Sequence, residues 1–312
     1  NLANDVDDHV VDALADAVTS RMKDISHRYY QMKARWFGSE TLAWWDRNAP
    51  LLGDDDRRYS WEEAKQIVCD SFAAFDGEMA SIAQEFFDKN WVDAGITTGK
   101  ASGAFSHPTV PSAHPYILMN FAGKARDVMT LAHEMGHGIH QVLASRQGAL
   151  MADTPLTLAE TASVFAEMLT FQRLLADAPD KSTKRFMLAG KIENMLNTVV
   201  RQIAFHNFEV AFHNARANGE LSAEQIGDIW METQKQALGP AVMTDEPYRN
   251  LWSYIPHFIH SPFYVYAYAF GDCLVNALWQ VDQDSDDKAG FVSAYKELLS
   301  AGGTKRYDAA LA

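Results

Sequence analysis

The sequence predicts a mainly α-helical protein that carries one small β-sheet. Apolar residues recur at helical spacing over most of the 312 residues, whereas glycines and prolines that prevent a helix are concentrated between Thr97 and Lys124. Hydrophobic residues make up 47% and charged residues 22% of the chain, which is ordinary for a globular protein with a sizeable core. We therefore expect residues 1–312 to form a single multi-helix domain.

The predicted helices follow from this periodicity in chain order. From Asp5 to Phe37, apolar side chains keep helical spacing for roughly eight turns, with charged residues between them. This pattern predicts one long opening helix. Further segments of the same kind are Trp61 to Phe75, Gly77 to Val92, Asp127 to Val142, Thr157 to Leu169, Lys184 to Ala217, Ser222 to Leu238, Phe263 to Gln280 and Phe291 to Ser300.

The stretch rich in glycine and proline contains two short segments that are candidates for extended structure, Gly103 to Ser106 and Tyr116 to Phe121. They predict a two- or three-stranded sheet immediately before the helix that starts at Asp127. One of these two segments would form an edge strand, to which an extended peptide could add.

The charge balance excludes several kinds of partner. With 27 Lys plus Arg against 41 Asp plus Glu, the net charge is -14, so we expect no nucleic-acid partner and no binding to anionic membranes. No apolar run reaches the ~18 residues of a membrane span, and no basic segment followed by an apolar stretch precedes the first predicted helix. The chain begins with Asn1, so we expect a fragment or a processed product, located in the cytoplasm.

The most informative motif begins at His133 and ends at His137. Residues four apart on a helix differ by about 40° in azimuth and about 6 Å along the axis, so both imidazoles can bind one ion at about 2.1 Å. Glu134 follows the first histidine and can reach a water molecule at the metal without being a ligand. The motif is the His-Glu-x-x-His arrangement of zincin-like metallopeptidases.

Neighbouring residues refine this interpretation. His140 lies about 10.5 Å along the helix from His133, so one ion cannot bind both, and we interpret His140 as a residue behind the ligands or in the site wall. Leu143 stands where a metzincin has its third histidine, which excludes that class. Gly136 and Gly138 each cost roughly 0.5–1 kcal/mol in a helix, so we expect another segment to pass close by.

A third ligand is expected on the next predicted helix. Glu160, Ser163 and Glu167 share one face of it, and acidic residues spaced in this way usually form a solvated stripe. Beside the histidine motif, however, a carboxylate 23 residues beyond His137 fits the gluzincin pattern of ligands. We expect Glu160 to be the third ligand and Glu167 to orient a histidine.

Several motifs occur along the chain in a fixed order: Lys33 to Gly38, Trp45 to Pro50, Gly99 to Phe105, Tyr116 to Asn120, Leu131 to His137 with His140, Glu160 to Glu167 and Pro256 to Tyr268. Together they resemble oligoendopeptidase F and its relatives, the thimet-oligopeptidase-like zinc metallopeptidases. The resemblance covers nearly the whole chain and implies that His133, His137 and Glu160 bind Zn²⁺, one ion per chain, with Glu134 as catalytic base.

The resemblance also gives a role to the aromatic segment near the C-terminus. From the residues alone, these aromatics are as expected for core or interface positions. By resemblance, His257 and Tyr264 donate hydrogen bonds to the substrate carbonyl as it becomes an oxyanion, and Tyr266 and Tyr268 are the alternatives. Family members are about twice as long and enclose oligopeptide substrates between two halves. We therefore expect this chain to be the C-terminal catalytic half, with the N-terminal helical half as its partner.

Three functions remain open at this point. The favoured one is a metalloendopeptidase that cleaves oligopeptides. A carboxydipeptidase of the same architecture would differ only by a cation that captures the C-terminal carboxylate of the substrate. A helical binding protein with a structural metal is the third, but such a site needs no base at Glu134.

Overall fold

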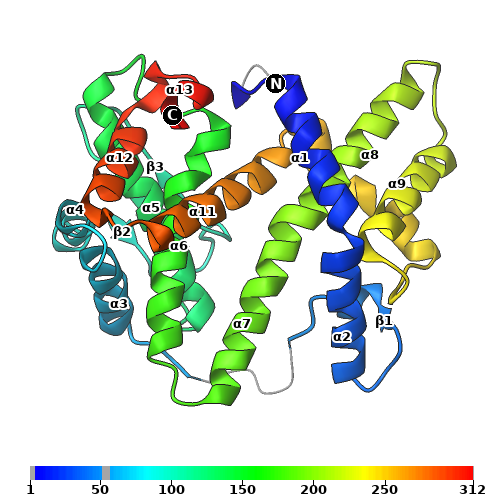
Figure 1. Cartoon of the computed structure of the whole chain (residues 1–312), viewed down its shortest axis with the longest axis horizontal. Coiled ribbons are helices and arrows are strands. Elements are labelled where there is room, and N and C mark those ends of the chain that lie inside the picture. The colour runs from blue at the N-terminus through cyan, green and yellow to red at the C-terminus, as the bar shows by residue number, and fades with distance from the viewer. Residues whose placement is uncertain (1–3, 51–56, 312) are drawn as a thin grey trace. The chain divides into compact units, whose positions relative to one another are not determined.

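The computed structural model describes residues 4–50 and 57–311, which fall into two compact units (Figure 1). The first unit comprises Asn1–Asp54 with Arg185–Cys273, and the second comprises Asp55–Lys184 with Leu274–Ala312. In the part of the chain that the structure describes, the chain passes from one unit to the other within two helices, α7 (Lys181–Met195) and α11 (Tyr266–Asp284). That the two units together form one catalytic domain stays a prediction.

The second unit is built around a long helix, α5 (Ala125–Ala144), which contacts helices and strands on several sides. Val128, Leu131, Met135 and Ile139 are fully buried along it, as the periodicity predicted. The other elements of this unit are α3 (Trp61–Ala73), α4 (Gly77–Asp88), α6 (Leu156–Ala176), α12 (Lys288–Ser300), α13 (Tyr307–Leu311), β2 (Val92–Asp93), β3 (Phe105–His107) and β4 (Tyr116–Leu118).

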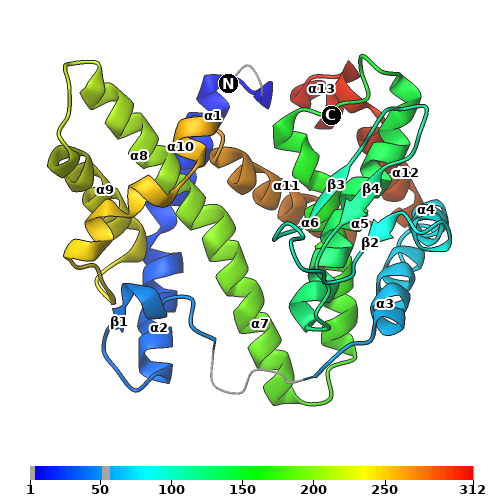
Figure 2. The ribbon, with the colours of Figure 1, turned by 180° about the vertical axis from the view of Figure 1, so that it is seen from behind.

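The three strands form one small sheet in the order β2-β4-β3, beside α5 (Figure 2). β2 pairs with β4 in parallel, and β3 pairs with β4 antiparallel with Ser106 opposite Ile117. The predicted sheet before the histidine helix is thus confirmed. The expectation that Tyr116 to Phe121 could offer a free edge is wrong, because β4 has a neighbour on each side.

The first unit is helical apart from one parallel pair of two-residue strands. Leu42 of β1 pairs with Val242 of β5. The large aromatic side chains of Trp230 and Tyr248 are almost fully buried in this unit. Its elements are α1 (Asp8–Arg21), α2 (Arg28–Trp36), α8 (Arg201–Arg216), α9 (Ala223–Leu238), α10 (His257–His260), β1 (Leu42–Ala43) and β5 (Val242–Met243), with a 3₁₀ segment at Glu246–Tyr254.

The mainly α fold is confirmed, with local corrections. π-helical turns at Lys23–His27 and Leu196–Val200 divide two segments that the periodicity predicts as single helices. The helix predicted to reach Val92 ends at Asp88, because Asn90 has a φ of 56° and turns the chain into β2. None of the helices in the described residues combines the length and the hydropathy that a membrane span needs.

Candidate metal centre

Two glycines on α5 allow neighbouring segments to approach its backbone. A Cβ atom on Gly136 would lie 2.5 Å from the carbonyl oxygen of Ala162 on α6. A Cβ atom on Gly138 would lie 2.7 Å from the ring of Phe86 on α4. The close approach that these glycines predicted is therefore present, and it brings the first turns of α6 against the histidine motif.

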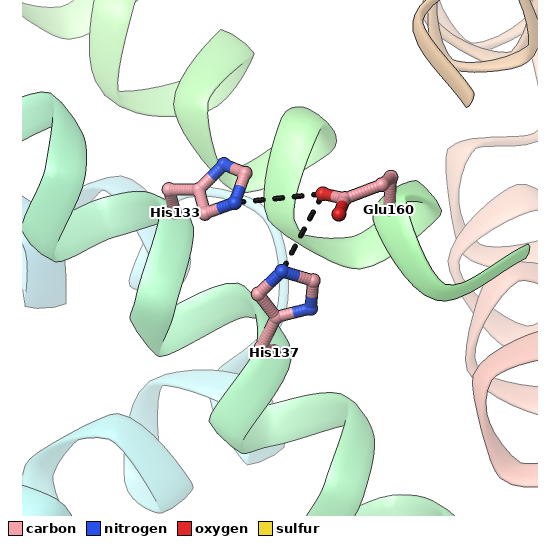
Figure 3. A group of neighbouring side chains, drawn as sticks. All are labelled: His133, His137 and Glu160. Carbon is pink, nitrogen blue, oxygen red and sulfur yellow. Dashed lines mark ion pairs between the residues drawn. The ribbon is translucent and has the colours of Figure 1, made fainter. Parts of the chain in front are cut away.

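The three residues predicted to bind a metal converge at this contact (Figure 3). The Nε2 atoms of His133 and His137 each lie 3.4 Å from Oε2 of Glu160. One donor atom from each of the three residues lies within 4.8 Å of the others. In the part of the chain that the structure describes, no other set of histidine, cysteine and carboxylate side chains meets this criterion for a metal site.

Two polar side chains on α6 hold these donors in place. Oε1 of Glu167 lies 2.7 Å from Nδ1 of His133, which leaves the Nε2 atom of that ring directed at Glu160. The buried Ser163 hydroxyl donates to Oε2 of Glu160 at 2.7 Å. Glu167 thus lies behind His133, and its role of orienting a metal ligand stays a prediction. For Ser163, the sequence showed only that it shares a helix face with the two glutamates.

The charges of this cluster are strongly coupled. Burial favours the neutral ring of His133, but the hydrogen bond and charge of Glu167 outweigh it and raise the pKa of His133 to about 9. Burial likewise opposes the charge of Glu160, but His137, His133 and Ser163 lower the pKa of its carboxyl group to about 2. Glu160 is therefore an ionised carboxylate that can serve as a metal ligand.

Glu134 lies in the same cluster without being one of its three converging donors. Its side chain is buried, and this burial raises the pKa of its carboxyl group, against the charges of His133 and His137. A carboxyl group whose pKa is raised by burial is better suited to accept a proton than an exposed one.

A cavity of about 640 Å³ opens beside His137. His140 lies in its wall, where Nε2 is 3.1 Å from the Thr154 hydroxyl, and burial lowers the pKa of this ring to about 4. Much of the remaining wall comes from residues 108–115, whose His114 ring stacks on Trp91 at 3.8 Å. The sequence marked this stretch only as one that cannot form a helix.

The sheet edge is tied to the same helix. The Ser106 hydroxyl of β3 donates to Oε1 of Gln141 on α5 at 2.9 Å, and Nε2 of Gln141 donates to the Ser106 carbonyl at 3.2 Å. These bonds fix the distance between β3, which is an edge strand of the sheet, and the helix that carries the histidines.

The aromatic segment predicted to assist catalysis lies in the first unit. The rings of His257 and Tyr264 stack with centroids 5.7 Å apart, and the Tyr268 hydroxyl lies 3.3 Å from Nε2 of His257. Tyr266 is different, because it is fully buried and its hydroxyl accepts a hydrogen bond from Asn4 at 2.7 Å. The hydroxyl of Tyr266 is thus hydrogen-bonded inside the core of the unit. His257, Tyr264 and Tyr268 form a separate aromatic cluster.

Comparisons with known proteins agree with this geometry. Residues 2–312 match the sequence profile of Peptidase family M3. Oligopeptidase PepF of Bacillus subtilis is 29% identical over 304 residues, which cover 97% of this chain and 45% of that protein. An oligoendopeptidase F homolog of Borreliella burgdorferi is 30% identical over 307 residues, which cover 97% of this chain and 51% of that protein.

Solved structures share the fold. A putative peptidase from Chlamydophila abortus superposes with a TM-score of 0.84 at 27% identity, covering 99% of this chain and 51% of that structure. The structure described as PZ peptidase A with inhibitor 2 gives a TM-score of 0.82 at 17% identity. The fold and the site define a metallopeptidase class. The chain belongs to Peptidase family M3, and it spans about half the length of the curated relatives it matches.

Proposed function

We propose that this chain carries the catalytic centre of a zinc-dependent metalloendopeptidase that hydrolyses short oligopeptides. The observation that supports this most is the convergence of His133, His137 and Glu160 within 4.8 Å, beside the buried carboxyl group of Glu134. The relatives named oligopeptidase and oligoendopeptidase support the class of substrate. The cytoplasm remains the predicted compartment.

The donor set fits zinc. Two imidazoles and one carboxylate on neighbouring helices are the three protein ligands of many catalytic zinc sites, which keep a fourth position open. When bound, zinc polarises the scissile carbonyl and lowers the pKa of a water molecule. Glu167 would keep the His133 ring in the orientation that zinc requires.

The chain's own residues would then move the protons. Glu134 accepts a proton from the attacking water and delivers it to the leaving amine. By resemblance to the family, His257 and Tyr264 are assigned as donors to the developing oxyanion, with Tyr268 hydrogen-bonded behind His257.

An extended peptide would bind along the edge of the small sheet. β3 is the edge strand tied to α5, so main-chain hydrogen bonds to Phe105–His107 would align the substrate with the helix of the histidines. The cavity beside His137 has room for substrate side chains at that end of the site.

The test combines metal content with turnover in the full-length protein. We expect one zinc ion per chain by elemental analysis, and a Glu160→Ala variant that holds zinc much more weakly. Glu134→Gln should keep its zinc and its fold but lose about 10²–10⁴-fold in kcat on a fluorogenic peptide, because an amide cannot accept the proton.

The matched control is Glu62→Gln, a change at an exposed glutamate. It should alter neither the zinc content nor kcat. Near-parent turnover in Glu134→Gln would exclude the general-base role. An active protein without any transition metal would exclude the zinc mechanism altogether.

A further inference from the structure

The first unit contains a small cavity that includes none of the metal-centre residues. It has a volume of about 10 Å³, which is room for one guest of roughly the size of a water molecule. Tyr30 of α2, Arg47, Arg201 at the start of α8, Gln234 of α9 and Tyr248 contribute to its wall. Segments far apart in the sequence therefore meet around this one space.

Two of these residues are arginines whose charge is not neutralised locally. Among the described residues, neither Arg47 nor Arg201 lies within 4.0 Å of a carboxylate oxygen. Arg47 donates to the Trp44 carbonyl at 3.2 Å, and the guanidinium of Arg201 lies over the Phe205 ring at 5.1 Å. Burial and the charge of Arg47 both lower the pKa of Arg201, which is consistent with two cations close together.

Glu193, a half-buried acid in the same unit, already has a cationic partner. Glu193 is in contact with the Lys33 ammonium, which is itself fully buried, and it accepts a hydrogen bond from the Tyr29 hydroxyl at 2.7 Å. The charge of Glu193 is thus balanced by Lys33, and among the described residues the two arginines have no carboxylate as a counterion.

A third wall residue presents a hydrogen-bond donor. Gln234 is 2% exposed, and its Oε1 atom accepts from the Tyr248 hydroxyl at 3.1 Å. Because Oε1 takes the Tyr248 hydroxyl, the donor atom of this amide is Nε2. Nε2 is buried and has no hydrogen-bond partner among the residues that the structure describes. Buried amide donors in native proteins nearly always have an acceptor, so this one points to a guest in the cavity.

We propose that this cavity is a binding site for a chloride ion. Two guanidinium groups and a buried amide N–H favour a guest that is negatively charged and accepts hydrogen bonds. A volume of about 10 Å³ is too small for phosphate or a substrate carboxylate, and it leaves room only for a guest as small as a single ion. The ion links α2, α8, α9 and the Glu246–Tyr254 segment, so it stabilises the first unit.

The first test is the melting temperature in sodium chloride against sodium gluconate at equal ionic strength. Binding to the folded state alone predicts that Tm rises with the logarithm of chloride concentration, by about 3 °C or more up to 100 mM. Gln234→Met and Arg201→Met should each abolish this chloride-specific rise. Arg216→Met is the matched control, because Arg216 is exposed on the same helix, and it should keep the rise.

The second test is crystallographic and uses the parent protein. Crystals soaked in bromide should show an anomalous peak between Arg47, Arg201 and Gln234. Equal Tm values in the two salts, a Gln234→Met variant that keeps the chloride-specific rise, or density in the cavity without an anomalous signal would each overturn the proposal. The bromide experiment and Gln234→Met remain decisive if Arg201→Met fails to fold.

Discussion

Glu209 on α8 is a buried carboxyl group next to the aromatic segment of the proposed site. It is 1% exposed and accepts a hydrogen bond from the backbone N–H of Phe263 at 2.8 Å. Phe263 has a φ of 58°, an unfavourable conformation for a residue with a side chain, and it directly precedes Tyr264. The hydrogen bond that Phe263 donates to Glu209 therefore helps to hold the turn that presents Tyr264.

This carboxyl group predicts a specific pH dependence of stability. Burial raises the pKa of Glu209 from its ordinary value of 4.5 to about 7, although the Phe263 N–H lowers it. Between these values the folded state holds a proton that the unfolded state has lost. The stability that Glu209 contributes is thus complete below about pH 4.5 and is lost as the pH rises through about 7.

Glu209→Gln should remove this dependence, because the amide stays neutral and can still accept from Phe263. From pH 5 to pH 8, Tm of the parent should fall relative to that of Glu209→Gln, measured by thermal denaturation in matched buffers. The exposed Glu220→Gln change should follow the parent. Parallel Tm curves for parent and Glu209→Gln would show that the group titrates normally.

Tyr264 can be tested through kinetics in a form of the protein that cleaves peptides. An oxyanion donor acts mainly in the transition state, so Tyr264→Phe should lower kcat and kcat/KM together by roughly 10–10³-fold, with little change in KM. Tyr307→Phe, on the short helix α13, serves as the control. A rise in KM alone would identify Tyr264 as a substrate-binding residue and favour Tyr268 as the donor.

At the scale of elements, the metal centre depends on how closely α5 and α6 pack. Gly136→Ala would place a methyl group 2.5 Å from the Ala162 carbonyl oxygen and 2.7 Å from the Ser163 Cα atom. Both are backbone atoms that cannot rotate away, so the two helices must separate. The separation would draw Glu160 away from the histidines.

We therefore expect Gly136→Ala to lower the free energy of unfolding by about 1–3 kcal/mol and to weaken zinc binding. Urea denaturation and competition with a chelator measure the two effects. Gly190→Ala on α7 is the matched control, since no atom beyond the neighbouring backbone of its own helix lies within 4 Å of the added methyl group. It should stabilise the protein by roughly 0.5–1 kcal/mol. If Gly136→Ala kept the zinc affinity of the parent, the metal centre would not depend on the close packing of α5 and α6.

At the scale of the whole molecule, this chain spans about half of each relative, and the N-terminal half remains its proposed partner. Catalysis on an extended peptide requires exclusion of water and firm positioning of the substrate. We expect this chain alone to bind zinc but to cleave oligopeptides slowly. Joining or mixing it with the preceding half should raise kcat/KM at least about 10-fold. Equal kcat/KM for the two forms would show that the preceding half is dispensable.

Features that depend on neighbouring residues in the chain were predictable from the amino-acid sequence. The i, i+4 spacing of His133 and His137, the buried stripe of α5 and the glycines and prolines around the sheet all act through local backbone geometry. Helix boundaries were less certain, because π-helical turns and the positive φ of Asn90 are stabilised by packing.

Features that depend on contacts between distant segments required the three-dimensional structure. The Ser163 hydrogen bond to Glu160, the edge position of β3, the burial of Tyr266 against Asn4 and the cavity between Arg47 and Arg201 each join residues whose proximity no local pattern encodes. Periodicity shows which face of a helix is buried, but not what it is buried against. Close packing of the core determines which segments are in contact. For the metal centre, the missing Cβ of Gly136 is as necessary as the ligands, because it lets α6 approach α5.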